Sequence, residues 1–387
     1  MSPGAAPRDG AAAGPAFIVA HNGAAIFGGA ERWTVRLLSG LQARGHRVLF
    51  LCRDEVVAAE ARRRGVEARV ARLGGHAMLL DAWRFARLLR ELRPDGLLLT
   101  TFKKTWLGGL GARLSGVPRV IARIGLSSDR PSRRFVYRVA LSRFVDRVVV
   151  NSDEIRAAVL ADLPGLDPRR VATIYNGVEA PRRRAEPGAL RRALGLAPGV
   201  PVVGSVARLA AQKRLDRLLR VVAGLPAPVV CLVAGDGPEA GALRALAREL
   251  GLGARVRFLG HRDDVGDVLA ALDLYLVTSD REGLSNSMLE ALAAGVPVIS
   301  TPVSGAAAAL GPLEDGRVPG RIVPADVGAI ARAVTECLAD ETGRRVMADA
   351  ARARVRAQFD PADELDRWER LLTIDAAADV GVPAPAD

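Results

Sequence analysis

Several features that mark secreted, membrane-spanning or disulfide-rich proteins are missing from this 387-residue sequence. No uninterrupted apolar run reaches the roughly 18–20 residues that a membrane-spanning helix needs. Residues 1–15 lack the apolar core of a secretion signal, so we expect a flexible tail there. The three cysteines lie far apart, which favours buried free thiols in a reducing cytoplasm over a disulfide framework or a cysteine metal site.

Aromatic residues are also scarce, at 4% of the chain, although the formal net charge is +12. Proteins that bind single-stranded nucleic acid combine basic side chains with aromatic ones, so the charge alone does not support that function. Of the 55 basic residues only three are lysines, namely Lys103, Lys104 and Lys213. Because arginine is used almost everywhere else, each lysine marks a position at which the identity of the side chain matters.

Apolar runs of strand length alternate with amphipathic runs of helix length through most of the chain. This order predicts an α/β fold of two doubly wound, Rossmann-like domains with parallel sheets that face each other across a cleft. The expected strands are 16–20, 46–52, 66–70, 96–100, 119–124, 147–151, 171–175, 202–207, 228–234, 255–259, 274–278 and 297–300. The expected helices are 30–43, 54–64, 77–92, 105–115, 132–144, 213–223, 238–250, 264–272, 286–294, 326–339, 343–357 and 361–373.

The prolines and arginines of 179–201 indicate a linker between the two halves. We therefore expect an N-terminal domain over residues 16–180 and a C-terminal domain over residues 181–360. Residues 361–373 are expected to form a helix that packs back on the N-terminal domain, and residues 374–387 to be a disordered tail.

The stretch SDREGLSNSMLEALAAGVPVIS, residues 279–300, contains a strand end, a short loop, an amphipathic helix and a buried strand. The first amides of such a helix lack partners and favour an anion such as a phosphate, and we expect Asn286 or Ser287 to cap the helix. Glu282 and Glu290 are placed to accept hydrogen bonds from paired hydroxyls, and a nucleotide-sugar offers two such pairs, on the hexose and on the ribose. The alternative is an ordinary capped helix with Glu290 on its solvent face.

A glycine-rich segment, HNGAAIFGGAER at residues 21–32, leads from the first strand into the first helix. Gly28 and Gly29 permit close approach of the backbone to a phosphate. The segment lacks the dinucleotide pattern G-x-G-x-x-G, and no G-x-x-x-x-G-K-[ST] loop occurs in the chain. A nicotinamide cofactor is therefore not expected.

The segment GSVARLAAQKR, residues 204–214, places Arg208 at the end of a buried strand and Lys213 five residues later. A forked guanidinium and a mobile ammonium at this spacing suit a diphosphate. The alternative is a sheet-end arginine and a solvated helix lysine. A further strand ends in VAGDGPE, residues 233–239, where Pro238 is expected at the first helical position.

In order along the chain, GSVARLAAQKR, VAGDGPE, RVRFLGH, the E-x7-E run from Glu282 to Glu290 and ALAAGVPVIS resemble the C-terminal half of a known enzyme family. That family is the retaining glycosyltransferases of family 4 (glycosyl transferases group 1), which have the GT-B fold. The segments GGAER, VNS at 150–152 and IYNGV at 174–178 are similar to its N-terminal half. The resemblance extends over about residues 16–372.

This resemblance implies a hexosyltransferase that moves a sugar from a nucleotide diphosphate sugar, such as a UDP- or GDP-sugar, to an acceptor hydroxyl with retention of configuration. The implied catalytic residues are Arg208 and Lys213, which hold the donor diphosphate, and Glu282, which faces the transferred sugar. Glu290 would hold the ribose. The implied donor-binding set is Gly28, Gly29, Arg208, Lys213, Gly283, Leu284, Ser285 and Glu290. The resemblance also implies that no cofactor and no metal are needed, which fits two cations and a helix N-terminus that can neutralise the leaving group.

The resemblance has two departures, both in regions that relatives use around the reacting sugar. The segment TTFKKTW, residues 100–106, lacks the histidine of many relatives, and SGAAAAL, residues 304–310, lacks their Gly-Gly and Glu. The acceptor is expected to be a glycan or lipid-linked molecule of cell-envelope polysaccharide, lipopolysaccharide or glycolipid synthesis. We expect a cytoplasmic protein that docks on an anionic inner membrane surface through basic residues of the N-terminal domain. These are Lys103, Lys104, Arg133 and Arg134.

Two other functions remain as alternatives. A hydrolysing nucleotide-sugar epimerase uses the same two-domain scaffold, but it would need a carboxylate and histidine acid-base set that the sequence does not place. A basic nucleic-acid-binding protein accounts for the charge only, and the low aromatic content counts against a nucleic-acid partner.

Overall fold

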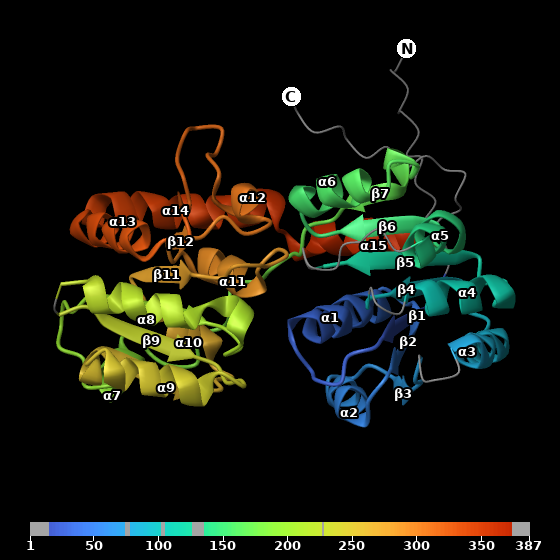
Figure 1. The fold of residues 1–387 in the computed structure, drawn as a ribbon, viewed down its shortest axis with the longest axis horizontal. Helices are drawn as coiled ribbons and strands as arrows, with labels where there is room; N and C mark the ends of the chain where they lie inside the picture. Colours follow the sequence, from blue (N-terminus) through green and yellow to red (C-terminus); the bar gives the residue numbers. More distant parts are fainter. Residues whose placement is uncertain (1–14, 74–77, 102–104, 126–134, 227, 374–387) are drawn as a thin grey trace, which may run out of the picture.

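The computed structural model of the chain describes residues 15–73, 78–101, 105–125, 135–226 and 228–373. These residues form two α/β domains that lie side by side, each built on one parallel sheet (Figure 1). The expectation of two doubly wound domains is confirmed. None of the described helices is both long and apolar enough to cross a bilayer.

The N-terminal domain contains a seven-stranded sheet in the order β3-β2-β1-β4-β5-β6-β7. Its strands are β1 (Phe17–Asn22), β2 (Arg47–Cys52), β3 (Ala68–Val70), β4 (Gly96–Leu99), β5 (Arg119–Ile124), β6 (Arg147–Val150) and β7 (Val171–Thr173). Neighbouring residues of one strand enter opposite cores, as Ile18 and Val19 do. Both faces of the sheet are therefore buried, which is why its strands are nearly continuous apolar runs.

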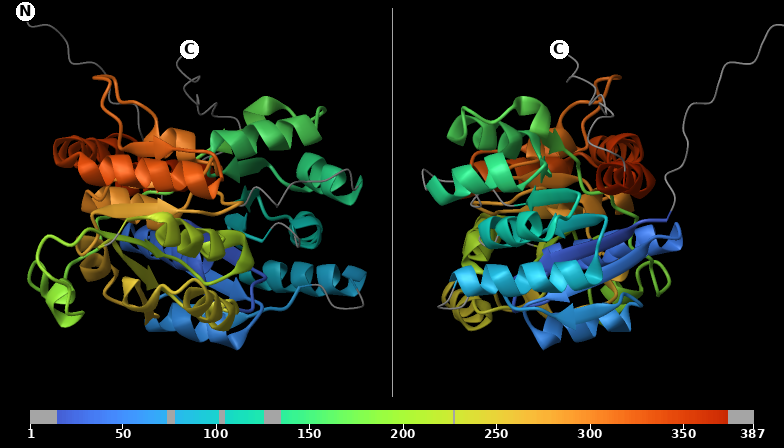
Figure 2. Two further views of the ribbon diagram at one scale, coloured as in Figure 1. Left: turned by 60° about the vertical axis from the view of Figure 1, so that its left-hand side comes forward. Right: turned by 90° about the vertical axis from the view of Figure 1, so that its right-hand side faces the viewer.

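Helices cover both faces of this sheet (Figures 1 and 2). The helices are α1 (Gly29–Ala43), α2 (Glu55–Arg63), α3 (Met78–Leu92), α4 (Thr105–Ser115), α5 (Phe135–Val139) with a π-helical turn at Ala140–Phe144, and α6 (Asp153–Asp162). Helix α6 was not among the expected elements. It begins after Ser152, whose side chain accepts a hydrogen bond from the amide of Ile155 at 3.3 Å.

The C-terminal domain contains a six-stranded sheet in the order β10-β9-β8-β11-β12-β13. Its strands are β8 (Val202–Val206), β9 (Val230–Ala234), β10 (Val256–Gly260), β11 (Leu274–Val277), β12 (Val298–Ser300) and β13 (Gly320–Ile322). The helices are α7 (Ala189–Ala193), α8 (Leu215–Gly224), α9 (Ala240–Glu249), α10 (Val265–Ala270), α11 (Asn286–Ala294), α12 (Ala306–Leu310), α13 (Val327–Ala339) and α14 (Glu341–Gln358). The short elements β13 and α12 were not expected from the sequence.

The chain passes between the domains at two adjacent places. It enters the C-terminal domain after β7 and returns between α14 and the last helix, α15 (Pro361–Thr373), which lies against the N-terminal domain (Figure 1). The two crossings touch, because the amide of Val178 donates to the carbonyl of Phe359 at 2.9 Å. Val178 packs in the C-terminal core, so we propose domain boundaries close to 180 and 360.

A buried carboxylate attaches α15 to the N-terminal domain. Glu364 accepts hydrogen bonds from Trp33 Nε1 at 2.5 Å, from Arg36 at 2.6 Å and from the amide of Gly177 at 2.8 Å. Trp33 also meets Trp368 edge to face, with ring centroids 5.3 Å apart. The pKa of Glu364 is raised overall, because the effect of burial outweighs that of Arg36 and of these hydrogen bonds, which lower it. Helix α15 is thus fixed to α1 and to the first crossing together.

Candidate active site

The stretch that the sequence singled out lies after the carboxyl end of β11, where ligands bind in open α/β sheets. Helix α11 spans Asn286–Ala294, as expected, but neither Asn286 nor Ser287 caps it. Ser285 occupies the N-cap position, but its side chain makes no capping hydrogen bond to the helix backbone, and Asn286 Oδ1 accepts from Nδ2 of Asn176 at 2.7 Å. The first amides of α11 are therefore left for a ligand.

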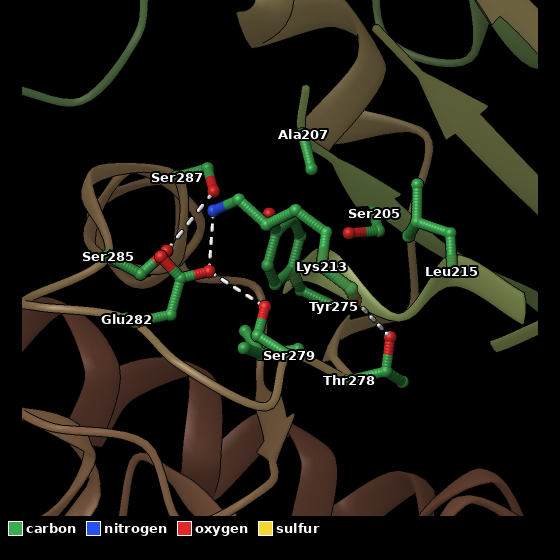
Figure 3. Close-up of a pocket in the computed structure, with 11 residues that line it drawn as sticks. Ser205, Ala207, Lys213, Leu215, Tyr275, Thr278, Ser279, Glu282, Ser285 and Ser287 are labelled. Atoms are coloured by element: carbon green, nitrogen blue, oxygen red, sulfur yellow. Dashed lines mark hydrogen bonds and ion pairs between the residues drawn. The ribbon is translucent and has the colours of Figure 1, made fainter. Parts of the chain in front are cut away.

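Two residues that the sequence analysis assigned to different parts of a donor meet directly in the structure. Lys213 Nζ lies 2.5 Å from Oε1 of Glu282, and Ser279 Oγ donates to the same oxygen at 2.7 Å (Figure 3). The side chains of Lys213 and Glu282 are 18% and 7% exposed. An ionised carboxylate at this depth needs a partner, and Lys213 neutralises the charge of Glu282.

This pair lines a pocket that is rich in hydroxyl groups (Figure 3). The lining residues are Ser205, Ala207, Lys213, Leu215, Tyr275, Val277, Thr278, Ser279, Glu282, Ser285 and Ser287. At its floor, Tyr275 Oη donates to the carbonyl of Val206 at 2.9 Å. Burial raises the pKa of Tyr275 to about 12, so this phenol is a neutral hydrogen-bonding group at physiological pH. The pocket joins one cation, one carboxylate and several hydroxyls beside the start of α11, which suits a polar, hydroxylated anion.

Glu290 lies one helical turn beyond the start of α11 and faces the other domain. Burial raises the pKa of Glu290, and the charges of Arg32 and Arg36 on α1 lower it. No described residue donates a hydrogen bond to its carboxylate. A partly buried carboxylate without a donor is a good acceptor for ligand hydroxyls, and the alternative of a Glu290 on the solvent face does not fit this partial burial.

The glycine-rich segment brings the start of α1 to the start of α11. Helix α1 begins at Gly29, and a Cβ atom at Gly29 would lie 3.9 Å from Nδ2 of Asn286. The amide of Gly28 donates to Oε2 of Glu31 at 2.9 Å, so the preceding turn is held by a side chain of its own helix. Two helix N-termini, one from each domain, therefore meet beside the pocket.

The loop after Ser279 also forms part of a tight seam between the domains. A Cβ atom at Gly283 would lie 1.9 Å from the carbonyl oxygen of Gly125, which follows β5. Nearby, Oε2 of Glu154 accepts from the amide of Gly305 at 3.0 Å. Glu154 lies on α6, and neither this residue nor its helix was predicted. The sequence feature that could have predicted this helix is the pair of acidic residues that follows Ser152.

The other expected site residues are placed less closely around the pocket. Arg208 follows β8 but is exposed, and its guanidinium makes no hydrogen bond or ion pair with the described residues. Leu284 is buried, 5% exposed, and packs in the C-terminal core. The four residues expected on the acceptor side, Lys103, Lys104, Arg133 and Arg134, lie outside the described residues. Within the described ranges no group of three or more His, Cys, Asp or Glu side chains is arranged to hold a metal ion.

Two parallel α/β domains with a pocket at the strand ends of the second domain are the architecture of GT-B glycosyltransferases, the class to which this fold and site correspond. The chain belongs to glycosyltransferase family 4. The family model described as Glycosyltransferase Family 4 matches residues 27–182, and the model described as Glycosyl transferases group 1 matches residues 188–354. The protein is therefore an enzyme of the hexosyltransferase type that uses a nucleotide-sugar.

Curated relatives support this assignment over most of the chain. The lipopolysaccharide core biosynthesis glycosyltransferase LpsE of Rhizobium meliloti is 30% identical over 352 residues, covering 89% of this chain and 96% of that protein. The 2-deoxystreptamine glucosyltransferase of Streptomyces kanamyceticus is 31% identical over 317 residues, covering 70% and 81%.

Solved structures show the same fold at lower identity. Anabaena HepE, in complex with UDP and glucose, has a TM-score of 0.78 at 23% identity and covers 91% of this chain and 98% of its own. WaaG, a glycosyltransferase involved in lipopolysaccharide biosynthesis, has a TM-score of 0.70 at 20% identity, with coverage of 92% and 99%.

Proposed function

We propose that this enzyme transfers a sugar from a UDP- or GDP-sugar to an acceptor hydroxyl with retention of configuration, in cell-envelope polysaccharide, lipopolysaccharide or glycolipid synthesis. The observation that carries the proposal is the Lys213–Glu282 pair in a hydroxyl-lined pocket beside the uncapped start of α11. Lys213 and the first amides of α11 provide positive charge for a diphosphate. Glu282 provides a carboxylate for the hydroxyls of a sugar. The lipopolysaccharide role of LpsE supports the envelope setting.

In the proposed complex the donor lies along α11 and divides the two carboxylates between its ends. Lys213 turns from Glu282 to the diphosphate, and Arg208, whose side chain is exposed, folds over the same phosphates. Glu282, released from Lys213, accepts hydrogen bonds from the transferred sugar. Glu290 accepts from the ribose hydroxyls, while the amides of Gly28 and Gly29 approach the diphosphate from the other domain.

The reaction exchanges one bond at the anomeric carbon of the donor. The bond from this carbon to the diphosphate oxygen breaks, the acceptor oxygen bonds to the same face of the carbon, and the hydroxyl proton leaves with the nucleoside diphosphate. Negative charge develops on the departing diphosphate, so the cations and the amides at the start of α11 act where charge increases. The residues Gly283, Leu284 and Ser285 place their backbone beside the sugar and phosphate in this arrangement.

The acceptor is proposed to be a glycan or a lipid-linked molecule that the N-terminal domain holds on the inner face of the plasma membrane. Lys103, Lys104, Arg133 and Arg134 remain proposed contacts to an anionic acceptor or surface.

A panel of UDP-, GDP- and ADP-sugars, scored by thermal shift, tests the proposal. The matching donor at 100 times its dissociation constant adds about 2.7 kcal/mol to the free energy of unfolding. Lys213→Met should lose this shift, whereas Arg192→Met, an exposed change on α7, should keep it. If no nucleotide-sugar stabilises the wild-type protein, the proposed donor site is wrong. Consumption of the donor to free sugar without an acceptor would favour the epimerase alternative.

A further inference from the structure

Three polar side chains form a continuous series of hydrogen bonds from the sheet of the N-terminal domain to the start of α11. Arg123 lies in β5 and is 5% exposed, Asn176 follows β7 and is 3% exposed, and Asn286 is the first residue of α11. Arg123 donates to Oδ1 of Asn176 at 3.0 Å, and Nδ2 of Asn176 donates to Oδ1 of Asn286 at 2.7 Å. None of the three residues has a role in the sugar transfer described above.

Arg123 determines which way both amide groups face. A guanidinium donates hydrogen bonds and accepts none, so the carbonyl oxygen of Asn176 must face Arg123. The amide nitrogen of Asn176 then faces Asn286, which must offer its own oxygen. The orientations of two amide groups therefore follow from one cation, and neither amide can reverse without breaking a hydrogen bond.

Arg123 is itself held in place by its surroundings. Its guanidinium carbon lies 3.8 Å from the centroid of the Trp33 ring, and Nε1 of Trp33 donates to Glu364 at 2.5 Å. If Asn176 turned over, its amide nitrogen would face this buried cation, and donors on both sides would lack an acceptor. The packing around Trp33 thus fixes the direction of the whole series.

As a result, Asn286 directs its amide nitrogen toward the N-terminal domain. This Nδ2 lies 3.9 Å from the position of a Cβ atom on Gly29, the first residue of α1. Within the described ranges no residue accepts a hydrogen bond from it, and Asn286 is only half-buried, so a ligand can reach the group. The N-terminal ends of α1 and α11 both lie beside it, and each carries unpaired amides that favour negative charge.

We propose that Asn286 is a further donor-binding residue, whose amide nitrogen donates a hydrogen bond to the diphosphate between α1 and α11. Arg123 and Asn176 are positioning residues that keep this nitrogen, and not the oxygen, turned toward the phosphates. The inference deepens the proposed function and rests on its donor site. The orientation matters because the side-chain oxygen of Asn286, turned the same way, would face the phosphate oxygens with charge of the same sign.

Binding of UDP and GDP to the full chain, measured by calorimetry, tests the proposal with whichever of the two wild type binds more tightly. Asn286→Ala removes the donor and should lower the affinity about 10-fold to 100-fold, as expected for a hydrogen bond to a charged group. Asn176→Asp keeps an acceptor for Arg123 but presents a second oxygen to Asn286. Asn286 then turns its nitrogen away from the ligand, so the affinity should fall by a comparable factor. The corresponding nucleoside, which has no phosphate, should bind both variants and wild type equally.

A double variant separates positioning from a general loss of structure. Asn176→Asp/Asn286→Ala should bind the nucleoside diphosphate no more weakly than Asn286→Ala, because Asn176 acts only through Asn286. The matched control is Gln358→Glu on α14, which also changes an amide to a carboxylate beside an arginine. Arg354 donates to Gln358 at 2.9 Å, and neither residue lines the pocket, so this variant should bind as wild type does.

The outcomes distinguish this inference from the proposed function. If wild type binds UDP or GDP and Asn286→Ala binds it equally well, Asn286 does not contact the diphosphate and only the inference fails. If Asn286→Ala loses affinity but Asn176→Asp does not, or if their losses add in the double variant, Asn176 does not position Asn286. If wild type binds neither nucleotide, the donor site itself is wrong, and the inference fails with it.

Discussion

Lys213→Met should destabilise the empty enzyme, because it leaves the carboxylate of Glu282 without its cation. Glu282 is 7% exposed and Lys213 18%, and the atoms that pair are 2.5 Å apart. Removing one partner of a buried ion pair costs about 3–5 kcal/mol. Ser279 still donates to Glu282 after the change, and water reaches the position of Lys213, so we expect a loss near the lower value.

The assay is thermal unfolding without ligand. A loss of about 3 kcal/mol corresponds to a fall in melting temperature of roughly 6–12 °C for a domain of this size. Lys213→Met/Glu282→Gln should recover at least half of that fall, because a neutral amide needs no cation. Glu282→Gln alone frees Lys213 in the empty site, so its affinity for the nucleoside diphosphate should equal or exceed that of wild type while sugar transfer falls.

Two results with these single and double variants would contradict the roles given to Lys213 and Glu282. If the double variant melts no higher than Lys213→Met, Glu282 is not the group that Lys213 neutralises. If Glu282→Gln lowers the affinity for the nucleoside diphosphate as much as Lys213→Met does, the two residues do not act on separate parts of the donor.

Two further changes examine the helix and the seam beside the pocket. Glu290→Gln should weaken nucleotide binding by about 10-fold to 100-fold, the value of a hydrogen bond to a charged group. Because burial raises the pKa of Glu290, wild-type nucleotide affinity should decline with falling pH from above the usual range of a glutamate, and the variant should lose this dependence. A carboxylate whose pKa is raised by folding lowers folding stability as pH rises through that pKa. Glu290→Gln should therefore melt no lower than wild type at neutral pH. A lower melting temperature of the variant would show that the charge of Glu290 has an unseen partner. Gly283→Ala places a Cβ atom 1.9 Å from the carbonyl oxygen of Gly125, so it should lower the free energy of unfolding by about 1–3 kcal/mol or open the seam. Gly241→Ala, which adds a Cβ atom in open space, is the control. Equal melting temperatures and equal activities of the two variants would show that the seam adjusts without cost.

Local patterns predicted the elements around the site well. Helix α11 has the bounds that the apolar spacing indicated, and each expected strand of both sheets is present within a few residues. Lys213, singled out because lysine is rare in this chain, lies in the pocket. These features depend on short-range periodicity and on residue choice, which a single sequence contains.

Features set by distant contacts could not be predicted. Lys213 and Glu282 are 69 residues apart in the chain, and nothing local indicates that they pair. Asn286 resembled a capping residue, but Asn176, 110 residues away, holds its side chain. Helix α6 was not predicted because its apolar residues are spread around the helix and do not form one face, although Ser152 and the acidic residues after it form a normal helix start.

The paired crossings between the domains limit how this enzyme can move. A single covalent link would permit the domains to swivel in any direction. Here two chain segments lie against each other, with Val178 bonded to Phe359 and Gly177 so close to Pro361 that a Cβ atom would lie 2.5 Å from its Cα. Two adjacent links leave mainly one rotation, about an axis through both. Asn176, next to the first crossing, donates a hydrogen bond to Asn286 at the start of α11. We therefore expect such a rotation to leave this helix start in place and to act mainly on the seam at Gly125 and Gly283.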